Sequence, residues 1–350
     1  MWSHTRYTIE SHDLRFMFQA SHPRNTEKSL THTPPSYHNP KKVNHLDPTL
    51  IGNTAAVLTS CLWAGSSLLF TTAGKRIGYF SVNAYRSLMA VVLLVVAQIF
   101  VLGSVLPAAS NEQWFWMSLS GIVGLGIGDF GLFAAYVLIG PRRSTLIMAL
   151  SAIFAAIGAY IMLGETLSYL ATIGIAITIA GIIIVLLEKE NHENTTIDGD
   201  KQKTWGIFAA FVAALCQGIG LVFSKKGMYI GVTAAMNPIS AAMIRMTTAT
   251  LFIFICALFL RKLPELQETT KDKKGLKYIA GGAIIGPFFG MTLSMLAVAN
   301  TGTGIAQTLM SLMPIVIIPL LWVIYKEKTN LRGIIGAVFA VVGVAILFLV

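Results

Sequence analysis

Ten apolar runs, each about 20 residues long, constrain the fold more than any other feature of this sequence. A helix needs about 20 consecutive apolar residues to cross roughly 30 Å of hydrocarbon. Composition agrees, because 55% of the 350 residues are hydrophobic and only 12% are charged, whereas soluble domains carry about 25% charged residues. The sequence therefore predicts an all-α membrane protein with ten transmembrane helices, at residues 50–72, 82–103, 113–139, 143–163, 167–187, 205–225, 238–260, 276–299, 303–325 and 330–350.

The basic charge fits the same class of protein. The net charge is +10, which in a soluble protein would indicate nucleic acid as a partner. Here most basic residues lie between the apolar runs, so we expect them to meet lipid headgroups and we expect no nucleic acid. The three cysteines all lie inside apolar runs and no pair has the spacing of a metal site. The sequence predicts no cofactor and no metal ion.

The chain divides into four parts by composition. Residues 1–48 hold six of the seven histidines and no apolar run, so they predict a disordered hydrophilic tail. Residues 49–188 and 205–350 hold five apolar runs each, and a charged linker, 189–204, separates them.

The two five-helix parts repeat each other. The stretch 121–184 aligns with 283–346 without a gap, and this alignment pairs Gly124 with Gly286, Gly128 with Gly290, Gly140 with Gly302, Glu165 with Glu327, Gly174 with Gly336 and Gly181 with Gly343. Because five is odd, the second part must insert upside down relative to the first. Inverted repeats of this kind are typical of secondary transporters, with the binding site near the midplane between the halves. We therefore predict two inverted five-helix repeats around a central cavity.

Two long stretches also carry a family resemblance. GDFGLFAAYVLIGPRRSTLIMALSAIFAAIGAYIMLGE (128–165) and GMTLSMLAVANTGTGIAQTLMSLMPIVIIPLLWVIYKE (290–327) resemble the two halves of EamA-type members of the drug/metabolite transporter superfamily. The resemblance covers about residues 50–350 and departs from the pattern at Lys326, which replaces a glycine, and in the long tail. It implies a ten-helix bundle with alternating access driven by exchange or an ion gradient. It also implies a cavity lined mainly by the third, fourth, eighth and ninth helices, with help from the first and sixth.

Asp129 is the residue that most needs an explanation. A charged residue at the centre of a membrane helix costs about 2.5–3.5 kcal/mol on insertion scales and faces the bundle or a wet cavity. Its mate in the repeat is Met291, so the shared fold does not require the acid. Asp129 is therefore a candidate to bind a proton, an ammonium group or another cation. The alternative is a static pair with Tyr136 or with an arginine.

Other charged residues have simpler interpretations. Arg86 of the second run and Arg245 of the seventh hold matching places, which favours a structural role such as snorkelling to headgroups or closing a helix end; an anion site or a gate is the alternative. We expect Lys225 to be an interfacial anchor or else to lie at the rim of the cavity. Glu165 and Glu327 are expected to cap helices, because a carboxylate stabilises a helix N-terminus.

Polar and aromatic residues inside the runs predict the binding site. Together they indicate a cavity for small amphiphilic metabolites, although each is weak evidence singly. The predicted substrate-binding residues are Trp63, Asp129, Tyr136, Ser151, Gln217, Arg245, Asn300 and Gln307.

The predicted function is secondary transport of a small metabolite, such as an amino acid or a related organic compound, by export or exchange. Protons or another coupling ion are candidate partners besides the substrate and membrane lipid. One alternative is an antiporter of anions such as phosphorylated or nucleotide-linked sugars, and another is a non-transporting receptor or scaffold. An intramembrane enzyme is not expected, because the runs contain no histidine and Asp129 has no second acid beside it.

We expect a multi-pass protein of the cell membrane with both termini on one side. Basic loops place the termini outside by the positive-inside rule, whereas the resemblance implies a cytoplasmic location, so the side stays open.

Overall fold

The computed structural model describes residues 47–186, 200–232, 234–316, 320 and 331–349, and within these ranges the chain forms helices and no strand. Nearly all of the predicted tail (1–48), the linker as far as residue 199, and Glu327 lie outside the described residues. The chain from Leu46 to Val350 forms one compact unit. The predictions of an all-helical fold and of a multi-pass membrane protein are confirmed.

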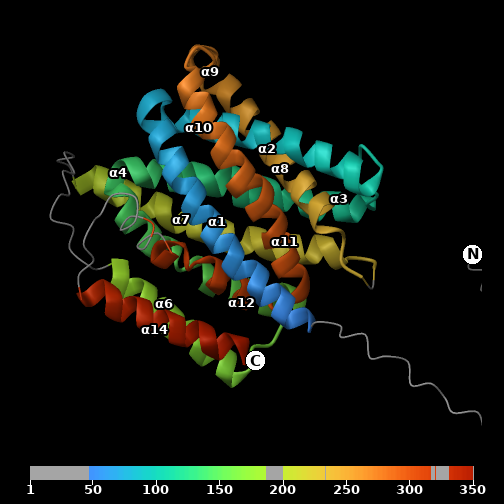
Figure 1. The fold of residues 1–350 in the computed structure, drawn as a ribbon, viewed down its shortest axis with the longest axis vertical. Coiled ribbons are helices and arrows are strands. Elements are labelled where there is room, and N and C mark those ends of the chain that lie inside the picture. The colour runs from blue at the N-terminus through green and yellow to red at the C-terminus, as the bar shows by residue number, and fades with distance from the viewer. Residues whose placement is uncertain (1–46, 187–199, 233, 317–319, 321–330, 350) are drawn as a thin grey trace, which may run out of the picture. The chain divides into compact units, whose positions relative to one another are not determined.

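The helices follow one another in two series (Figure 1). The first series is α1 (Pro48–Ile77), α2 (Tyr79–Leu102), α3 (Asn111–Ser120), the π-helical turn η1 (Gly121–Ile127), α4 (Gly128–Met148), α5 (Ser151–Leu163) and α6 (Tyr169–Leu186). The second is α7 (Asp200–Tyr229), α8 (Pro238–Phe259), α9 (Leu263–Thr269), α10 (Lys273–Ala283), η2 (Ile284–Gly290), α11 (Met291–Asn300), α12 (Thr303–Met310) and α14 (Leu331–Phe348).

Six described stretches are long and apolar enough to cross a membrane: Pro48–Ile77, Tyr79–Leu102, Asn111–Ala135, Lys201–Tyr229, Pro238–Phe259 and Lys273–Asn300. Four shorter apolar helices accompany them: Ser151–Leu163, Tyr169–Ile184, Thr303–Val316 and Arg332–Phe348. One predicted boundary is wrong, because residues 140–142, expected to separate two helices, fall inside the range of α4. Pro141 lies inside this range, where it cannot donate a backbone hydrogen bond to the preceding turn.

Helix starts follow the local sequence. Asp47 accepts a hydrogen bond from the Thr49 backbone N–H at 2.9 Å, and Pro48 takes the first position of α1. Asn237 and Pro238 repeat this arrangement at the start of α8. A short polar side chain followed by proline satisfies an open N–H group and presets the helical backbone angle, which explains both starts.

Both series bend at the same place. Leu150 N–H donates to the Ile147 carbonyl at 3.0 Å, and its mate Leu312 donates to the Leu309 carbonyl at 3.3 Å. The carbonyls of Leu150 and Leu312 match as well, since each accepts two bonds from the following turn. The tight three-residue spacing of the first pair of bonds is that of a 3₁₀ turn. The repeat predicted from sequence is therefore present in the backbone itself.

The π-helical turns also match. When the repeats are aligned as above, η1 falls within one residue of η2. π-Helical turns are rare, and they are found frequently at functional sites. In the second series Pro287 lies inside the turn and removes one backbone donor there.

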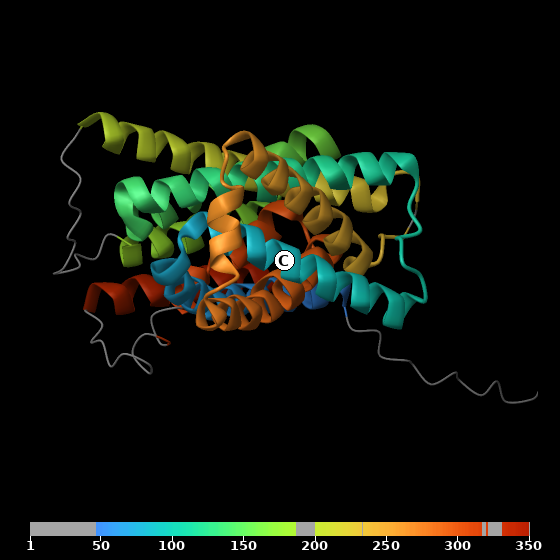
Figure 2. The same cartoon turned by 90° about the horizontal axis from the view of Figure 1, so that it is seen from above.

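The two series pack mainly on each other. The most extensive contacts join α6 to α14, and α4 and α5 to α7, followed by those of α1 with α10 and α11 and of α2 with α8. The stretch from α3 through η1 to α4 lies alongside α7 (Figure 2). The space between the two series is therefore bordered by both.

Matched glycines bring α6 and α14 together. The two helices lie side by side (Figure 1). A Cβ on Gly174 would lie 2.9 Å from Leu347, and one on Gly181 would lie 2.7 Å from the Gly336 carbonyl oxygen. Gly343 is equally tight against Thr178. Without a side chain at these positions the helix backbones approach closely, as small-residue faces do in membranes.

Candidate functional site

A cavity of about 260 Å³ lies between the two series and is lined by residues of both. It extends from Gln217 and Gln307 to Tyr79 near the start of α2 and to Thr71 on α1, which is exposed. Its walls are mainly apolar and aromatic, with a few polar groups. This composition is that of a small-molecule site.

Of the eight predicted binding residues, five line the cavity, one has a side chain outside the described part of the chain, and two lie away from the cavity wall. Those that line the cavity are Trp63, Asp129, Ser151, Gln217 and Gln307. The Tyr136 side chain lies outside the described part of the chain.

Two of the predicted residues are not among those that line the cavity. Asn300 is not on the cavity wall, because its side-chain amide donates to the Leu296 carbonyl of its own helix at 2.8 Å. Arg245 is not on the wall either, since its side chain is buried against Met291 and Met295.

Asp129 is held by a cluster of polar side chains. Its carboxylate pairs with the Arg86 guanidinium and accepts a hydrogen bond from the Gln217 amide at 3.0 Å. Asn83 Oδ1 accepts from Arg86 Nε at 2.9 Å and from Nη2 at 2.8 Å. The ion pair between Asp129 and an arginine, one of the alternatives predicted from the sequence, is therefore present in the structure.

Aromatic rings support Arg86 from outside this cluster. Its guanidinium carbon lies 5.6 Å from the centre of the Phe70 ring and 5.4 Å from that of Phe133. Cation–π contacts of this length are attractive and strengthen when the cation is shielded from water. Arg86 thus lines the cavity and does not snorkel toward headgroups, so that part of the prediction is wrong.

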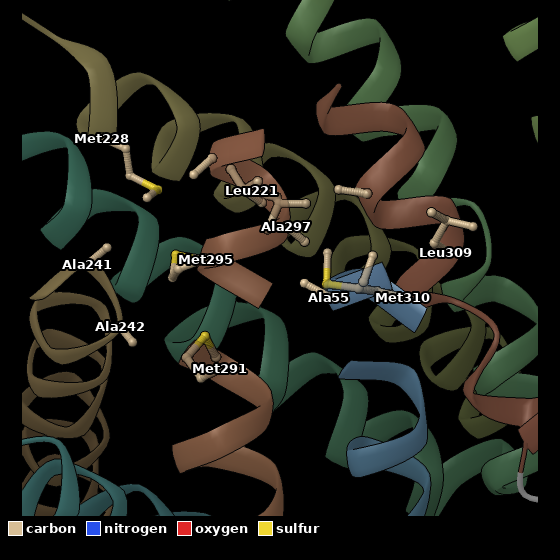
Figure 3. Packing of buried hydrophobic residues seen from close by; sticks show 14 of the residues in the cluster. Ala55, Leu221, Met228, Ala241, Ala242, Met291, Met295, Ala297, Leu309 and Met310 are labelled. Atoms are coloured by element: carbon tan, nitrogen blue, oxygen red, sulfur yellow. The ribbon is translucent and has the colours of Figure 1, made fainter. Parts of the chain in front are cut away.

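The matched arginine of the second series has different surroundings. Arg245 is 2% exposed. Its Nη1 lies 3.8 Å from Met291 Sδ and 3.7 Å from Met295 Sδ, and both methionines lie on the side of α11 that faces α8 (Figure 3). Its Nε has no hydrogen-bond partner among the described residues. The residue that takes the place of Asp129 here is Met291, which offers only a weak acceptor.

A bond across the two series crosses the deep end of the cavity. The Gln307 amide donates to Ser151 Oγ at 2.9 Å. Ser151 follows the bend at Leu150, and Gln307 lies in α12 before the matching bend. Both bends therefore position side chains that touch the same cavity.

A second polar network, outside the residues that line the cavity, joins the two series near the start of α1, where Thr301 donates to Asn53. Lys225 Nζ donates to the carbonyls of Val298 at 2.6 Å and Thr301 at 2.9 Å, and it lies 3.9 Å from a Glu165 oxygen. Glu165 in turn accepts from the Thr303 backbone N–H at 2.7 Å. The sequence predicted Lys225 as an interfacial anchor or at the rim of the cavity, and in the structure it binds protein carbonyls.

Glu165 does cap a helix, as predicted, but the helix belongs to the other series. Thr303 is the first residue of α12, so the carboxylate satisfies an open N–H group there. Its mate Glu327 lies outside the described residues.

Sequence reasoning missed Asn83 as a site residue. It lines the cavity and is 1% exposed, and its Nδ2 group has no hydrogen-bond partner in the described part of the chain. The available signal was its position three residues before Arg86 on one helix face, a spacing at which side chains meet.

No group of three metal-binding side chains occurs within the ranges that the structure describes. The three cysteines are free thiols.

Comparison with known proteins gives one family and one fold. The sequence model of the EamA-like transporter family matches residues 50–187 and 204–349. No curated protein matches the chain. Thirty chains of solved structures match it; one, described as "Crystal structure of protein", is 18% identical with a TM-score of 0.65, and the alignment covers 86% of this chain and 96% of that one. At this identity the likeness concerns the fold alone.

Proposed function

Because this chain belongs to the EamA-like transporter family, we propose that it is a secondary active transporter that moves a small organic metabolite across the membrane by alternating access. The observation that carries the proposal is the cavity between the two repeats, at the level of the matched bends and π-helical turns. Binding sites of transporters lie at such repeat interfaces, where helices are interrupted. The family consists of transporters and not of enzymes.

The proposed architecture has ten transmembrane helices in two inverted repeats of five. The repeats comprise residues 49–188 and 205–350, with 189–204 as linker and 1–48 as tail. Matched bends at Leu150 and Leu312 support the duplication. An odd number of helices in each repeat places the second upside down, and ten crossings place both termini on one side. We assign the protein to the cell membrane.

The two ends of the cavity support the alternating-access part. Lys225, Glu165 and Thr303 are not part of the cavity wall and tie the repeats together beyond it, whereas Thr71, on the wall, is exposed. We infer that this arrangement is one of two states, closed at the Lys225 end. In the second state the Lys225 contacts separate and the opposite end closes.

The size and walls of the cavity favour a small substrate. Ligand sites commonly measure about 300–1,000 Å³, and this cavity, at about 260 Å³, lies just below that range. A single-ring compound or an amino acid suits it, and a nucleotide-linked sugar does not. Export or exchange is the proposed direction, and protonation of Asp129 is the proposed route for coupling.

Transport by purified protein in lipid vesicles tests this function. The full chain is reconstituted and screened with radiolabelled amino acids and small organic acids. Ser67→Phe narrows the cavity from α1, and Leu58→Phe, on the outward face of the same helix, is the matched control. We expect flux of the active compound to fall about tenfold or more in the first variant, a loss of roughly 1.4 kcal/mol per factor of ten, with no change in the second.

Equal flux in both variants would place the pathway elsewhere. Absence of flux for every compound, with ligand binding retained, would favour the receptor alternative. A Glu165→Gln variant adds a kinetic check, because weakening the closed end should change flux without abolishing binding.

A further inference from the structure

The ionic groups around the cavity do not balance. Arg86 and Asp129 neutralise each other. At the closed end, Lys225 is balanced by Glu165. Arg245 has no carboxylate within ion-pair distance among the described residues, although it lies within electrostatic reach of Asp129. Two guanidinium groups therefore share one carboxylate, and the cluster keeps one positive charge.

Arg245 is surrounded by groups that offer little compensation. Its Nη1 contacts the two methionine sulfurs. Its Nη2 lies close to Gly124, since a Cβ added to that glycine would be 3.2 Å from Nη2. Its Nε is buried without a partner in the described ranges. A buried charge without a counter-ion is strongly unfavourable, so such groups are normally paired or neutralised. A charged side chain without a counter-ion inside a membrane segment therefore indicates a functional site. The missing counter-charge can be supplied by a bound ligand.

The wall of the cavity presents donors without acceptors. Asn83 Nδ2 is buried and unsatisfied among the described residues, while Asn83 Oδ1 already accepts two bonds from Arg86. Arg86 uses Nε and Nη2 in bonds to Asn83 and Asp129, and its Nη1 makes no bond within the described part of the chain. Two donors from residues of the same cavity wall, one of them cationic, suit the two oxygens of a carboxylate.

We propose that the transporter binds its substrate as an organic monoanion, with a carboxylate on Arg86 Nη1 and Asn83 Nδ2 and a small apolar or aromatic body against Trp63 and Phe70. This inference rests on the proposed function and deepens it. A bound monoanion brings the cluster of Arg86, Arg245 and Asp129 to zero net charge. A zwitterionic amino acid or an uncharged compound leaves the excess charge of Arg245 uncompensated, and an amine adds to it.

Four probes with one body and different charges test the charge preference. Phenylpropanoate is an anion, phenylpropanamide is neutral, phenylalanine is a zwitterion and phenylpropylamine is a cation. Their dissociation constants are measured by titration calorimetry on the purified full chain near pH 7, where these charge states hold, in about 0.1 M NaCl. We expect the anion to bind about tenfold or more tightly than each of the other three.

Two variants remove the excess charge by opposite routes. Arg245→Met deletes the cation and keeps an apolar side chain against the methionines. Met291→Asp adds a carboxylate beside Arg245, at the place that Asp129 takes in the first repeat. Neither residue is one that we assign to contact with the substrate carboxylate. In both variants the advantage of the anion should fall to about threefold or less, and if one variant fails to fold the other still decides.

Several results would overturn the inference. These are equal or weaker binding of the anion compared with the amide, undetectable binding of the anion at millimolar concentration, and an unchanged preference in a folded variant. Chloride in the buffer competes, so a site that any inorganic anion fills would show no preference and would also count against it. Flux of only neutral or cationic compounds in the vesicle screen would refute this inference and leave the transport function standing. Selective anion binding without any flux would refute the transport function and leave this inference standing.

Discussion

The two repeats share the same bends and π-helical turns but differ in side-chain chemistry at the matched positions Asp129 and Met291. In the first repeat a guanidinium, Arg86, meets a carboxylate, Asp129. In the second repeat Arg245 meets Met291, the mate of Asp129. The bends and π-helical turns nevertheless match. The difference teaches that the scaffold does not require the ion pair, and that the asymmetry of charge is a property of the site.

The ion pair should be the most sensitive feature of the first repeat. Asp129→Met copies the second repeat into the first and leaves Arg86 beside the cavity without its carboxylate. Breaking a buried pair costs about 3–5 kcal/mol, and we expect the lower end because Arg86 borders the cavity. The apparent melting temperature in detergent should fall clearly.

A double variant measures how much the two charges of the ion pair stabilise each other, apart from their other contacts. Arg86→Met with Asp129→Met removes both charges, so it should be more stable than Asp129→Met alone. A coupling energy close to zero in this cycle would show that the two charges do not stabilise each other.

The α6–α14 contact brings matched glycines of the two repeats together. Gly181→Ala places a Cβ against the Ala340 backbone, so we expect a loss of about 1–3 kcal/mol from overpacking. Gly65→Ala is the matched control, because a Cβ there meets nothing within 4 Å, and it should be neutral or slightly stabilising. Thermal melting of both variants measures the difference. Equal melting temperatures would mean that the two helices are not packed as closely as described.

The bends offer a milder exchange between the repeats. Pro314 occupies in the second repeat the place of Ala152 in the first, where the Ala152 N–H makes only a long bond of 3.3 Å to the Ala149 carbonyl. Ala152→Pro should therefore be tolerated, with a loss well below the helix-interior value of about 3 kcal/mol. Ala155→Pro, one turn further into α5, should show that usual loss in full. A similar loss in both variants would contradict the structural equivalence of the two bends.

Much of this organisation was predictable from the sequence, for identifiable reasons. Apolar runs and matched glycines are local signals, so the helices and the duplication could be inferred from them. Asp129 also stood out, since an acid within an apolar run is costly. The alignment of 121–184 with 283–346 also identifies Met291 as the counterpart of Asp129.

The partners of the charged residues were not predictable. Asp129 and Arg86 lie 43 residues apart, and Lys225 meets carbonyls 73 and 76 residues away. Such pairs depend on which helices pack together and in what rotation. The amide of Asn300 bonds back to its own helix, an option that polar side chains in membrane helices often take and that its sequence position does not reveal. The continuation of α4 across residues 140–142 was not predicted, because a short gap between two apolar runs fits a turn as well as a helix.

The smallest expected loss of stability concerns an exposed ion pair between Arg76 and Asp272. Arg76 Nε lies 2.9 Å from Asp272 Oδ2 outside the cavity, and the Gly275 backbone N–H together with Arg76 holds the pKa of the Asp272 carboxyl below its usual value. A depressed pKa in the folded state stabilises the protein above the carboxyl's unfolded pKa, and this contribution is lost as the pH falls through the folded pKa. Because solvent screens the pair, Asp272→Asn should barely change the melting temperature at neutral pH. It should also remove a small part of the decline in stability below about pH 4. A drop as large as that of Asp129→Met would show that exposure does not separate the two pairs, and that the burial of Asp129 is not what makes its pairing with Arg86 strong.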